Sequence, residues 1–459
     1  MIKILKNKIE NKSVVILGFG REGQSTYKLI RKYFPEKLLA ISDKNKNIIE
    51  EKKYNYNDKN LKFSLGEKYM KGINNYDVIF ISPGISLENQ KRFVAKKRIT
   101  SQSDIFLEAY SKQIIGVTGT KGKSTTASLI HEIIKYHTKN TVLVGNIGIA
   151  PFDSISKIDK NTRIVFEISS HQLKYVKYSP YIGVLLNIFQ EHLDHYNSFD
   201  DYKDTKYFIT KYQNKTDHFI YNLDDDNILK KLNNYSSKKY YHTFSLQKNQ
   251  NNGCYSDEEL INYIENNESF EFFSLSTPRF LKGEHNIKNI MAAIICCKIS
   301  GIPDKAILEG IKSFRGLKHR LEYVGNYRNI HFYNDSIATI PEATIEAVRT
   351  IKNIDTIILG GLDRGLDYGF LTEFLAGTSI KNFIFMGKAG ERMMKLIKTK
   401  SNKSQNLFFT ETLDDAFKII KSNTEAEKVC LLSPAAASYD VFRDFIERGE
   451  AYKKLARSI

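Results

Sequence analysis

The sequence contains few cysteines and no long apolar run. Its 459 residues include only four cysteines, and none of them form a Cys-x-x-Cys spacing. This scarcity argues against a zinc module or a disulfide framework and fits a reducing compartment. Apolar runs such as 181–186 and 290–297 are too short to span a bilayer. The N-terminal stretch MIKILKNKIENKS lacks the apolar core of a signal peptide, so we expect a cytoplasmic protein without membrane insertion.

Acidic residues are also in deficit, and the formal net charge is +17. A charge of this sign can indicate nucleic acid or an anionic membrane surface as a partner. The lysines are spread along the whole chain among asparagine, isoleucine and tyrosine, with only short basic runs such as 96–98. We therefore interpret the charge as a compositional bias and expect no nucleic-acid partner.

The stretch 114–128, IIGVTGTKGKSTTAS, carries the clearest chemical signal. An apolar strand leads into a glycine-rich loop, and a helical pattern follows. Glycines let backbone N–H groups converge on phosphate oxygens, the lysine adds positive charge, and the next hydroxyl can hold Mg²⁺. The strict G-x-x-x-x-G-K-[ST] pattern is not met, because its first glycine would fall at Val117, but the variant T-G-T-x-G-K-[ST] fits. The alternative is a glycine turn that happens to precede a lysine. The predicted phosphate loop consists of Gly119, Thr120, Lys121, Gly122, Lys123, Ser124 and Thr125.

A second glycine-rich loop lies near the N-terminus. The apolar run 13–19 enters the pattern G-x-G-x-x-G, which ends at Gly23. Asp43 follows about 20 residues later, where a dinucleotide-binding unit places its ribose-binding acid. A further strand, 77–81, ends in Ser-Pro-Gly, and ligands of open parallel sheets bind at such strand ends. These patterns alone predict NAD, whereas the phosphate loop downstream favours another nucleotide-like ligand. The candidate ligand-binding residues here are Gly20, Asp43, Ser82, Pro83 and Gly84.

Metal-capable side chains lie at two strand ends beyond the phosphate loop. Glu167 is part of an apolar strand, where an unpaired carboxylate is costly, so Mg²⁺ at the phosphates is the expected partner. The alternative is a core glutamate paired with lysine or arginine. The strand 182–188 runs into QEHLDH, whose histidines we expect in phosphate or Mg²⁺ chemistry rather than in core packing. A helix predicted over 199–210 carries Lys203, Lys206 and Lys211, for which a solvated face is the default.

The remaining chain adds a further α/β part. The segment 222–276 is rich in Asn, Lys, Tyr and Ser and suggests no chemistry, and 316–320 looks like a hinge. Strands expected at 330–333, 356–359, 383–386 and 429–432 then restart the strand–helix alternation, and a helix is expected at 441–455. We predict an α/β protein of three domains, each an open, mainly parallel sheet flanked by helices. These domains are Rossmann-like (1–110), P-loop ATPase-like (111–318) and Rossmann-like (319–459).

Three such domains with TGTKGKST in the middle one resemble the Mur ligase family, the ATP-dependent enzymes that build the peptidoglycan stem peptide. Further shared stretches are GNIG, FEISSHQL, EHLDH, GEHNIKN, GLKHRLE and NDSIAT. The stretches SPGI, NDSIATIPEAT, GGLDRG and SPAAASYDVFRDFIERG are most similar to the D-glutamate-adding branch. The DNPR and D-Y-x-H-H-P motifs of other branches are absent. The resemblance implies that a carboxylate of UDP-N-acetylmuramoyl-L-alanine attacks the γ-phosphate of ATP, and that the amine of D-glutamate then attacks the acyl phosphate. These small molecules are the expected partners, and we expect a monomer.

The resemblance also implies roles for individual residues. Lys123 and Ser124 would hold the phosphates and Mg²⁺ together with Glu167. His192 would bind a second Mg²⁺, and Lys206 matches a lysine that carries a carbamate and so acts as a metal ligand. The residues that match ATP contacts are Asn289, Arg320 and Asp335. The residues that match substrate contacts are Asn146 and, in the D-glutamate pocket, Thr339, Arg364, Ser438 and Phe445. Gly20, Asp43 and 82–84 would face UDP rather than NAD.

Some positions depart from the family pattern. Ile337 stands where some members carry a lysine, and Arg364 replaces a lysine of one branch. Arg21 and Glu22 replace the small polar and apolar residues expected in the UDP loop. Two rival functions are an NAD-dependent dehydrogenase and a basic nucleic-acid-binding ATPase. Neither explains the phosphate loop, the Glu167 and His192 stretches and the third α/β part together.

Overall fold

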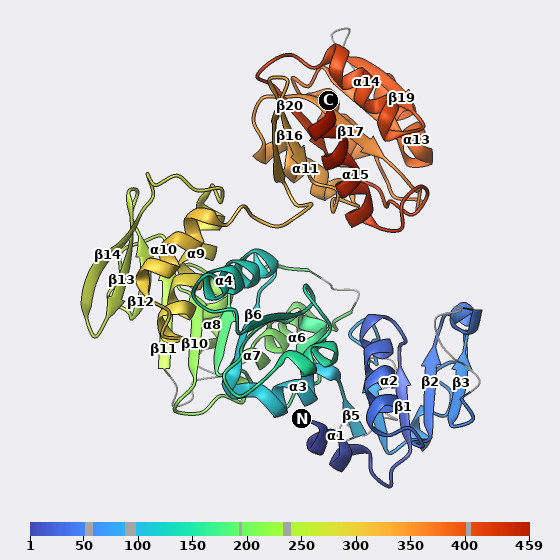
Figure 1. Cartoon of the computed structure of the whole chain (residues 1–459), viewed down its shortest axis with the longest axis vertical. Helices are drawn as coiled ribbons and strands as arrows, with labels where there is room; N and C mark the ends of the chain where they lie inside the picture. Colours follow the sequence, from blue (N-terminus) through green and yellow to red (C-terminus); the bar gives the residue numbers. More distant parts are fainter. Residues whose placement is uncertain (51–57, 88–97, 192–194, 233–239, 401–404) are drawn as a thin grey trace. The chain divides into compact units, whose positions relative to one another are not determined.

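The structure is a computed structural model that describes residues 1–50, 58–87, 98–191, 195–232, 240–400 and 405–459. The chain forms two compact units, Met1–Phe314 and Arg315–Ile459. It contains three mainly parallel sheets flanked by helices (Figure 1), so the predicted fold class is confirmed. The boundary between the units lies beside the predicted hinge at 316–320. In the described ranges, no helix is long and apolar enough to cross a membrane.

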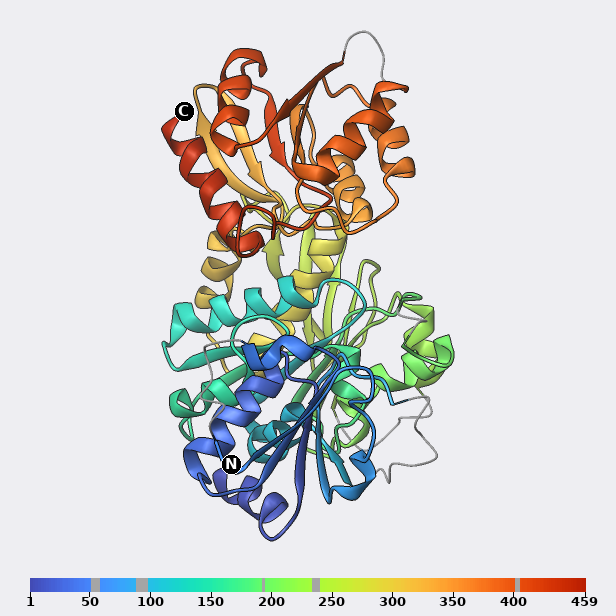
Figure 2. The ribbon, with the colours of Figure 1, turned by 90° about the vertical axis from the view of Figure 1, so that its right-hand side faces the viewer.

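The first sheet is parallel throughout, with the strand order β3-β2-β1-β4-β5. Its strands are β1 (Val14–Leu17), β2 (Leu39–Asp43), β3 (Leu61–Leu65), β4 (Val78–Ile81) and β5 (Ile99–Thr100). The helices of this part are α1 (Ile2–Ile9), α2 (Arg21–Tyr33) and α3 (Gln102–Tyr110), and α2 lies along the sheet (Figure 2). Every residue of β1 is buried, as expected of a strand in a parallel sheet. The chain order reverses at β1, which makes the carboxyl ends of β1 and β4 the expected place for a ligand.

The central sheet has nine strands in the order β14-β13-β12-β11-β10-β9-β6-β8-β7. β13 is antiparallel to both neighbours, and the other neighbouring strands are parallel. The strands are β6 (Ile114–Thr118), β7 (Thr141–Gly145), β8 (Arg163–Glu167), β9 (Ile182–Leu185), β10 (His218–Asn222), β11 (Tyr240–Ser245), β12 (Gly253–Ser256), β13 (Leu260–Glu265) and β14 (Glu268–Ser274). Strands β11 to β14 come from the segment without assigned chemistry and extend the sheet beyond β10.

Helices α4 (Lys123–His137), α9 (Glu284–Ile299) and α10 (Asp304–Ser313) pack against one another and share one apolar core with β6. The shorter helices are α5 (Ser170–Leu173), α6 (Phe199–Lys206), α7 (Phe208–Lys211) and α8 (Asp226–Leu232). The single helix predicted over 199–210 is therefore wrong in its length. The helix is interrupted at Tyr207, between α6 and α7. There ψ is −11°, and the buried side-chain hydroxyl donates a hydrogen bond to the carbonyl of Ile228.

The C-terminal unit contains one sheet with the order β15-β16-β20-β17-β18-β19, in which only β15 is antiparallel to its neighbour. Its strands are β15 (Glu322–Tyr327), β16 (Ile330–Asn334), β17 (Ile354–Gly360), β18 (Asn382–Met386), β19 (Asn406–Thr410) and β20 (Val429–Leu432). Its helices are α11 (Pro341–Thr350), α12 (Gly369–Ala376), α13 (Gly387–Lys398), α14 (Leu413–Asn423) and α15 (Phe445–Ser458). The helix predicted from residue 441 begins later, because the side chain of Asp444 accepts a hydrogen bond from the Glu447 N–H and caps the helix there.

Candidate active site

The predicted phosphate loop connects β6 to α4. Gly122 has a φ of +83°, and a Cβ there would lie 2.6 Å from Oδ1 of Asn289, so only glycine fits without strain. The segment after β9 holds the loop from the other side, since the Thr120 N–H donates to the Asn187 carbonyl at 2.9 Å and the Lys121 N–H to its Oδ1 at 2.8 Å. The loop backbone is thus held by hydrogen bonds from the protein itself.

Two lysine ammonium groups converge on this loop. Nζ of Lys123 donates to the carbonyls of Gly119 at 3.0 Å and Thr120 at 2.8 Å. Nζ of Lys206, at the end of α6, donates to the same Gly119 carbonyl at 2.8 Å. Lys206 is 1% exposed, and burial, with the nearby charge of Lys123, holds its pKa well below the usual lysine value. The solvated position that is the default for a helix lysine is therefore wrong for Lys206.

Tyr202 is a residue of this site that the sequence analysis missed. It lies one helical turn before Lys206, its ring lies 4.7 Å from the Lys206 ammonium, and its hydroxyl is 2.9 Å from Oγ1 of Thr120. Burial raises the pKa of this phenol to about 12, so it stays neutral. The signal available in the sequence was the i, i+4 spacing, which places Tyr202 and Lys206 on one helix face.

Glu167 ends β8 and is completely buried. Its Oε1 accepts a hydrogen bond from Nδ2 of Asn146 at 3.1 Å, and within the described part of the chain its Oε2 has no hydrogen-bond partner. β8 pairs with the phosphate-loop strand β6, with Val117 in register with Glu167. A buried carboxylate whose side chain meets, among the described residues, a neutral amide suits a cation, and hard oxygen donors suit Mg²⁺.

Of the other predicted metal ligands, the structure describes Ser124 but not His192. Ser124 lies in the first turn of α4, directly after Lys123, whereas His192 lies outside the described residues. Among the described residues, no three His, Cys, Asp or Glu side chains form a metal-binding group. Mg²⁺ on nucleotide phosphates usually keeps several waters and takes only one or two protein ligands, so a site of this kind does not require such a group.

Asn289, predicted to contact ATP, lies on α9 against the first turns of α4. Its Oδ1 accepts a hydrogen bond from Oγ1 of Thr126 at 3.1 Å, and the side chain is 5% exposed. The contact between Asn289 and Gly122 places this asparagine at the mouth of the phosphate loop.

The first sheet brings three predicted ligand-binding loops together. Oδ2 of Asp43, at the end of β2, accepts a hydrogen bond from the Phe19 N–H at 2.6 Å. Oγ of Ser82, after β4, donates to the carbonyl of Gly18 at 2.6 Å. Gly20 precedes the first residue of α2, and Pro83 and Gly84 follow Ser82 at the same edge. Asp43 therefore shapes the glycine loop, a role that its spacing did not reveal.

In the C-terminal unit, Asp335 follows β16 and is 4% exposed. Its Oδ1 accepts from the N–H of Leu321 at 3.1 Å, and its Oδ2 accepts from Oγ of Ser433 at 2.9 Å. Burial raises the pKa of this carboxyl to about 7, although Ser433, the Leu321 N–H and the charge of Arg320 oppose the rise. The two residues predicted to contact ATP in this unit, Arg320 and Asp335, therefore belong to one local network.

Of the four residues predicted for the amino-acid pocket, Thr339, Arg364 and Ser438 lie on the loops after β16, β17 and β20, and Phe445 is the first residue of α15. Arg364 donates to the Thr339 carbonyl at 3.1 Å, which joins two of these loops. The third loop carries Ser438 and leads to Phe445, whose carbonyl accepts a hydrogen bond from Oγ of Ser336 at 2.8 Å. The guanidinium of Arg364 is exposed and can face a ligand.

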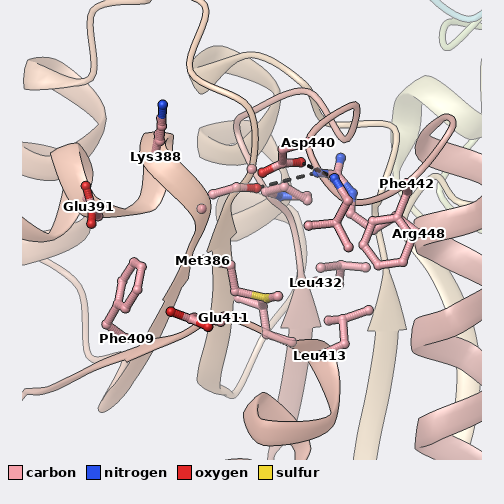
Figure 3. Close-up of a pocket in the computed structure, with 16 residues that line it drawn as sticks. Met386, Lys388, Glu391, Phe409, Glu411, Leu413, Leu432, Asp440, Phe442 and Arg448 are labelled. Atoms are coloured by element: carbon pink, nitrogen blue, oxygen red, sulfur yellow. Dashed lines mark hydrogen bonds between the residues drawn. The ribbon is translucent and has the colours of Figure 1, made fainter.

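A cavity of about 250 Å³ lies at the carboxyl ends of β17, β18 and β20 (Figure 3). Figure 3 shows Arg448 and Asp440 on one side of it and Phe409 and Glu411 on the other. Arg448 is buried and donates to the carbonyls of Ser336 at 2.9 Å and Ala436 at 3.1 Å. None of the four predicted amino-acid contacts is among the residues that line this cavity.

Helix α15 approaches the start of the C-terminal unit closely. A Cβ on Gly449 would lie 2.1 Å from Nδ1 of His319. The same nitrogen is 2.9 Å from Nδ2 of Asn334, a fully buried side chain at the end of β16. The glycine is needed for this contact between helix and imidazole.

Comparisons with known proteins agree with this geometry. The profile described as "Mur ligase middle domain" matches residues 117–297, a range that includes the phosphate loop, Glu167, Lys206 and Asn289. Two proteins named UDP-N-acetylmuramoylalanine--D-glutamate ligase are similar to this chain. The one from Elusimicrobium minutum (strain Pei191) is 34% identical to this chain, and the one from Thermoanaerobacter sp. (strain X514) is 30% identical. These alignments cover 99% of both chains in the first case and, in the second, 97% of this chain and 98% of the relative.

Among solved structures, UDP-N-acetylmuramate-alanine ligase from Thermotoga maritima shares the fold, with a TM-score of 0.57 and 17% identity over 98% of this chain and all of that one. The MurF ligase of the same organism in complex with ADP has a TM-score of 0.52 at 16% identity, over 83% of this chain and 89% of that one. The fold, the phosphate loop with its two lysines and the identity along nearly the whole sequence lead to one conclusion: the chain is a ligase of the Mur ligase family.

Proposed function

We propose that the chain adds D-glutamate to UDP-N-acetylmuramoyl-L-alanine with consumption of ATP, in the synthesis of peptidoglycan precursors. The observation that carries the ligase chemistry is the buried Glu167, whose Oε2 has no hydrogen-bond partner among the described residues and which ends the strand beside the phosphate-loop strand. The choice of D-glutamate rests on the names of the full-length relatives.

The reaction joins two anionic substrates, so the site must neutralise and align charge. The carboxylate of the UDP substrate attacks the γ-phosphorus of ATP, and ADP leaves. The amine of D-glutamate then attacks the acyl carbon of the acyl phosphate, an amide bond forms, and phosphate leaves after the amine has lost a proton. In this proposal the loop N–H groups and Lys123 hold the phosphates of ATP. Mg²⁺, held by Ser124 and Glu167, would lower the repulsion between phosphate and carboxylate.

We propose that Lys206 carries a carbamate and that His192 takes part in a second Mg²⁺ site. Carbamate formation needs a neutral amine and CO₂, and burial of Lys206 favours the neutral amine. A carbamate would also carry a negative charge that the neighbouring Lys123 ammonium attracts. The converted side chain would then offer two oxygens to a metal ion, which an ammonium cannot do.

In this proposal, each of the three α/β parts binds one substrate. Residues 1–110 bind the UDP substrate where β1, β2 and β4 end, 111–318 bind ATP, and 319–459 bind D-glutamate through Thr339, Arg364, Ser438 and Phe445. Convergence of Gly18, Asp43 and Ser82 supports the first assignment. We propose that the enzyme acts as a monomer in the cytoplasm, where ATP is supplied, and light scattering after gel filtration tests the monomer.

Release of phosphate from ATP tests the function directly. With UDP-N-acetylmuramoyl-L-alanine present, we expect release to depend on D-glutamate and not on L-glutamate, L-alanine or a diamino acid. Arg364 suits a dicarboxylate, because its planar guanidinium can pair with a carboxylate through two hydrogen bonds. Better turnover with L-alanine would refute the choice of amino acid, and no release with any amino acid would refute the ligase itself.

A further inference from the structure

Arg21 and Glu22, the two residues that depart from the expected UDP loop, contact the central α/β part. Nη2 of Arg21 donates to the carbonyl of Gly145 and, at 3.3 Å, to that of Asn146. Oε1 of Glu22 accepts a hydrogen bond from Nε2 of Gln172 at 2.6 Å. Both residues begin α2, directly after Gly20, so they follow the loop that would face the diphosphate of UDP.

The partners of Arg21 and Glu22 in the central part come before and after the candidate metal ligand Glu167 in the sequence. Gly145 is the last residue of β7 and Asn146 follows it, and Asn146 makes two hydrogen bonds to Glu167. Its side chain donates to Oε1 at 3.1 Å, and its N–H donates to the Glu167 carbonyl at 3.0 Å. Gln172 lies on α5, just after β8, where its side chain also accepts from the N–H of Ser169 in a capping box.

Glu22 is hydrogen-bonded through its backbone as well as through Oε1 of its side chain. It is 7% exposed, and its backbone carbonyl accepts a hydrogen bond from Nε2 of Gln102 at 2.9 Å. A buried hydrogen-bonded side chain transmits a displacement of its helix to its partner, because other rotamers would leave polar groups unpaired. Movement at the start of α2 would therefore reach the loops that orient Glu167.

We infer that Arg21 and Glu22 are positioning residues that couple the binding of the UDP substrate to the binding of Mg²⁺-nucleotide at Glu167. The inference rests on the proposed function, because it takes the UDP substrate as the ligand of the first pocket. Coupling between two sites is reciprocal, so each ligand tightens the binding of the other by the same factor. A coupling factor of about 5 or more is expected for such contacts.

Calorimetric titration tests the coupling without measuring turnover. The dissociation constant of UDP-N-acetylmuramoyl-L-alanine is measured with and without saturating Mg²⁺-ADP. For the unchanged protein we expect tighter binding with Mg²⁺-ADP present. Arg21→Ala should bring the ratio of the two constants close to one, with little change in the constant measured without nucleotide, and Arg21→Lys should restore part of the ratio. Gln172→Leu, which removes the hydrogen-bond partner of Glu22, should also reduce the ratio of the two dissociation constants.

Lys32→Ala is the matched control, because it removes a cation from the exposed end of the same helix. It should leave the ratio unchanged. A full ratio in Arg21→Ala, or a ratio of one in the unchanged protein, would overturn the inference. So would an equal loss of affinity with and without nucleotide, since that would make Arg21 a direct ligand contact. If the unchanged protein binds no UDP substrate at all, the proposed function fails instead, and the two failures are thus distinguished.

Discussion

Replacing Asp335 by asparagine should make the C-terminal unit more stable at alkaline pH. The pKa of this buried carboxyl rises from an ordinary value of 3.8 to about 7 in the folded protein. The folded state therefore holds a proton that the unfolded state has lost, and stability falls as pH rises from about 4 to about 7. Since one pKa unit corresponds to about 1.4 kcal/mol, ionised Asp335 costs on the order of 4 kcal/mol above pH 7.

The asparagine side chain can keep the existing hydrogen bonds. Its Oδ1 accepts from the Leu321 N–H, and its Nδ2 donates to Oγ of Ser433, whose own proton can turn to Thr344 at 3.1 Å. The substitution thus removes the charge and retains the shape. Between pH 5 and pH 8.5, the free energy of unfolding of Asp335→Asn should rise relative to that of the unchanged protein by about 3 kcal/mol.

Scanning calorimetry of the full chain measures this change. For a unit of this size, 3 kcal/mol corresponds to about 8 °C in the midpoint of its transition. Asp367→Asn makes the same chemical change at an exposed position and serves as the control. A difference between Asp335→Asn and the unchanged protein that stays constant from pH 5 to pH 8.5 would show that Asp335 does not titrate in this range, and the reasoning from burial would be wrong.

Further predictions concern the phosphate loop and its surroundings. Lys123→Ala should abolish turnover and leave calorimetric binding of the UDP substrate largely intact; equal loss of both would contradict the assignment of the two pockets. Lys206→Ala should lose most activity and Lys206→Arg should do no better, because arginine cannot form a carbamate, and carbon-13 NMR with labelled bicarbonate should show the adduct in the unchanged protein only. Gly122→Ala should weaken ADP binding at least about 10-fold through strain and the clash with Asn289, a shift of about 1.4 kcal/mol. Glu167→Gln should raise the Mg²⁺ concentration for half-maximal activity by about 10-fold or more, and an unchanged requirement would remove Glu167 as a metal ligand.

The parts of the fold that were predictable have local sequence signals. Buried parallel strands such as β1 and β6 are apolar runs followed by glycine, and the two glycine-rich loops carry the G-x-G-x-x-G pattern and the T-G-T-x-G-K-[ST] variant of the phosphate loop. Burial of a carboxylate in an apolar strand also singled out Glu167 without any long-range information.

Other features depend on contacts between distant segments. The strands β11, β12 and β13 lie in a segment rich in polar residues, so their apolar periodicity is weak, and they are held by pairing with one another and, through β11, with β10. Burial of Lys206 follows from its contact with the Gly119 carbonyl, which its own helix does not indicate. The role of Arg21 likewise depends on the end of β7, where its partner Gly145 lies 124 residues further along the chain.

The close approach of Gly449 to His319 has an evolutionary consequence. Glycine inside a helix usually costs about 1 kcal/mol relative to alanine, so an unconstrained position would drift to other residues. Here any side chain at 449 would collide with the imidazole, which lies 130 positions earlier and itself contacts Asn334. Among relatives, these three positions should therefore vary as a set. A sequence that retains the histidine and the asparagine should retain the glycine, and one that loses the histidine should be free to gain alanine there.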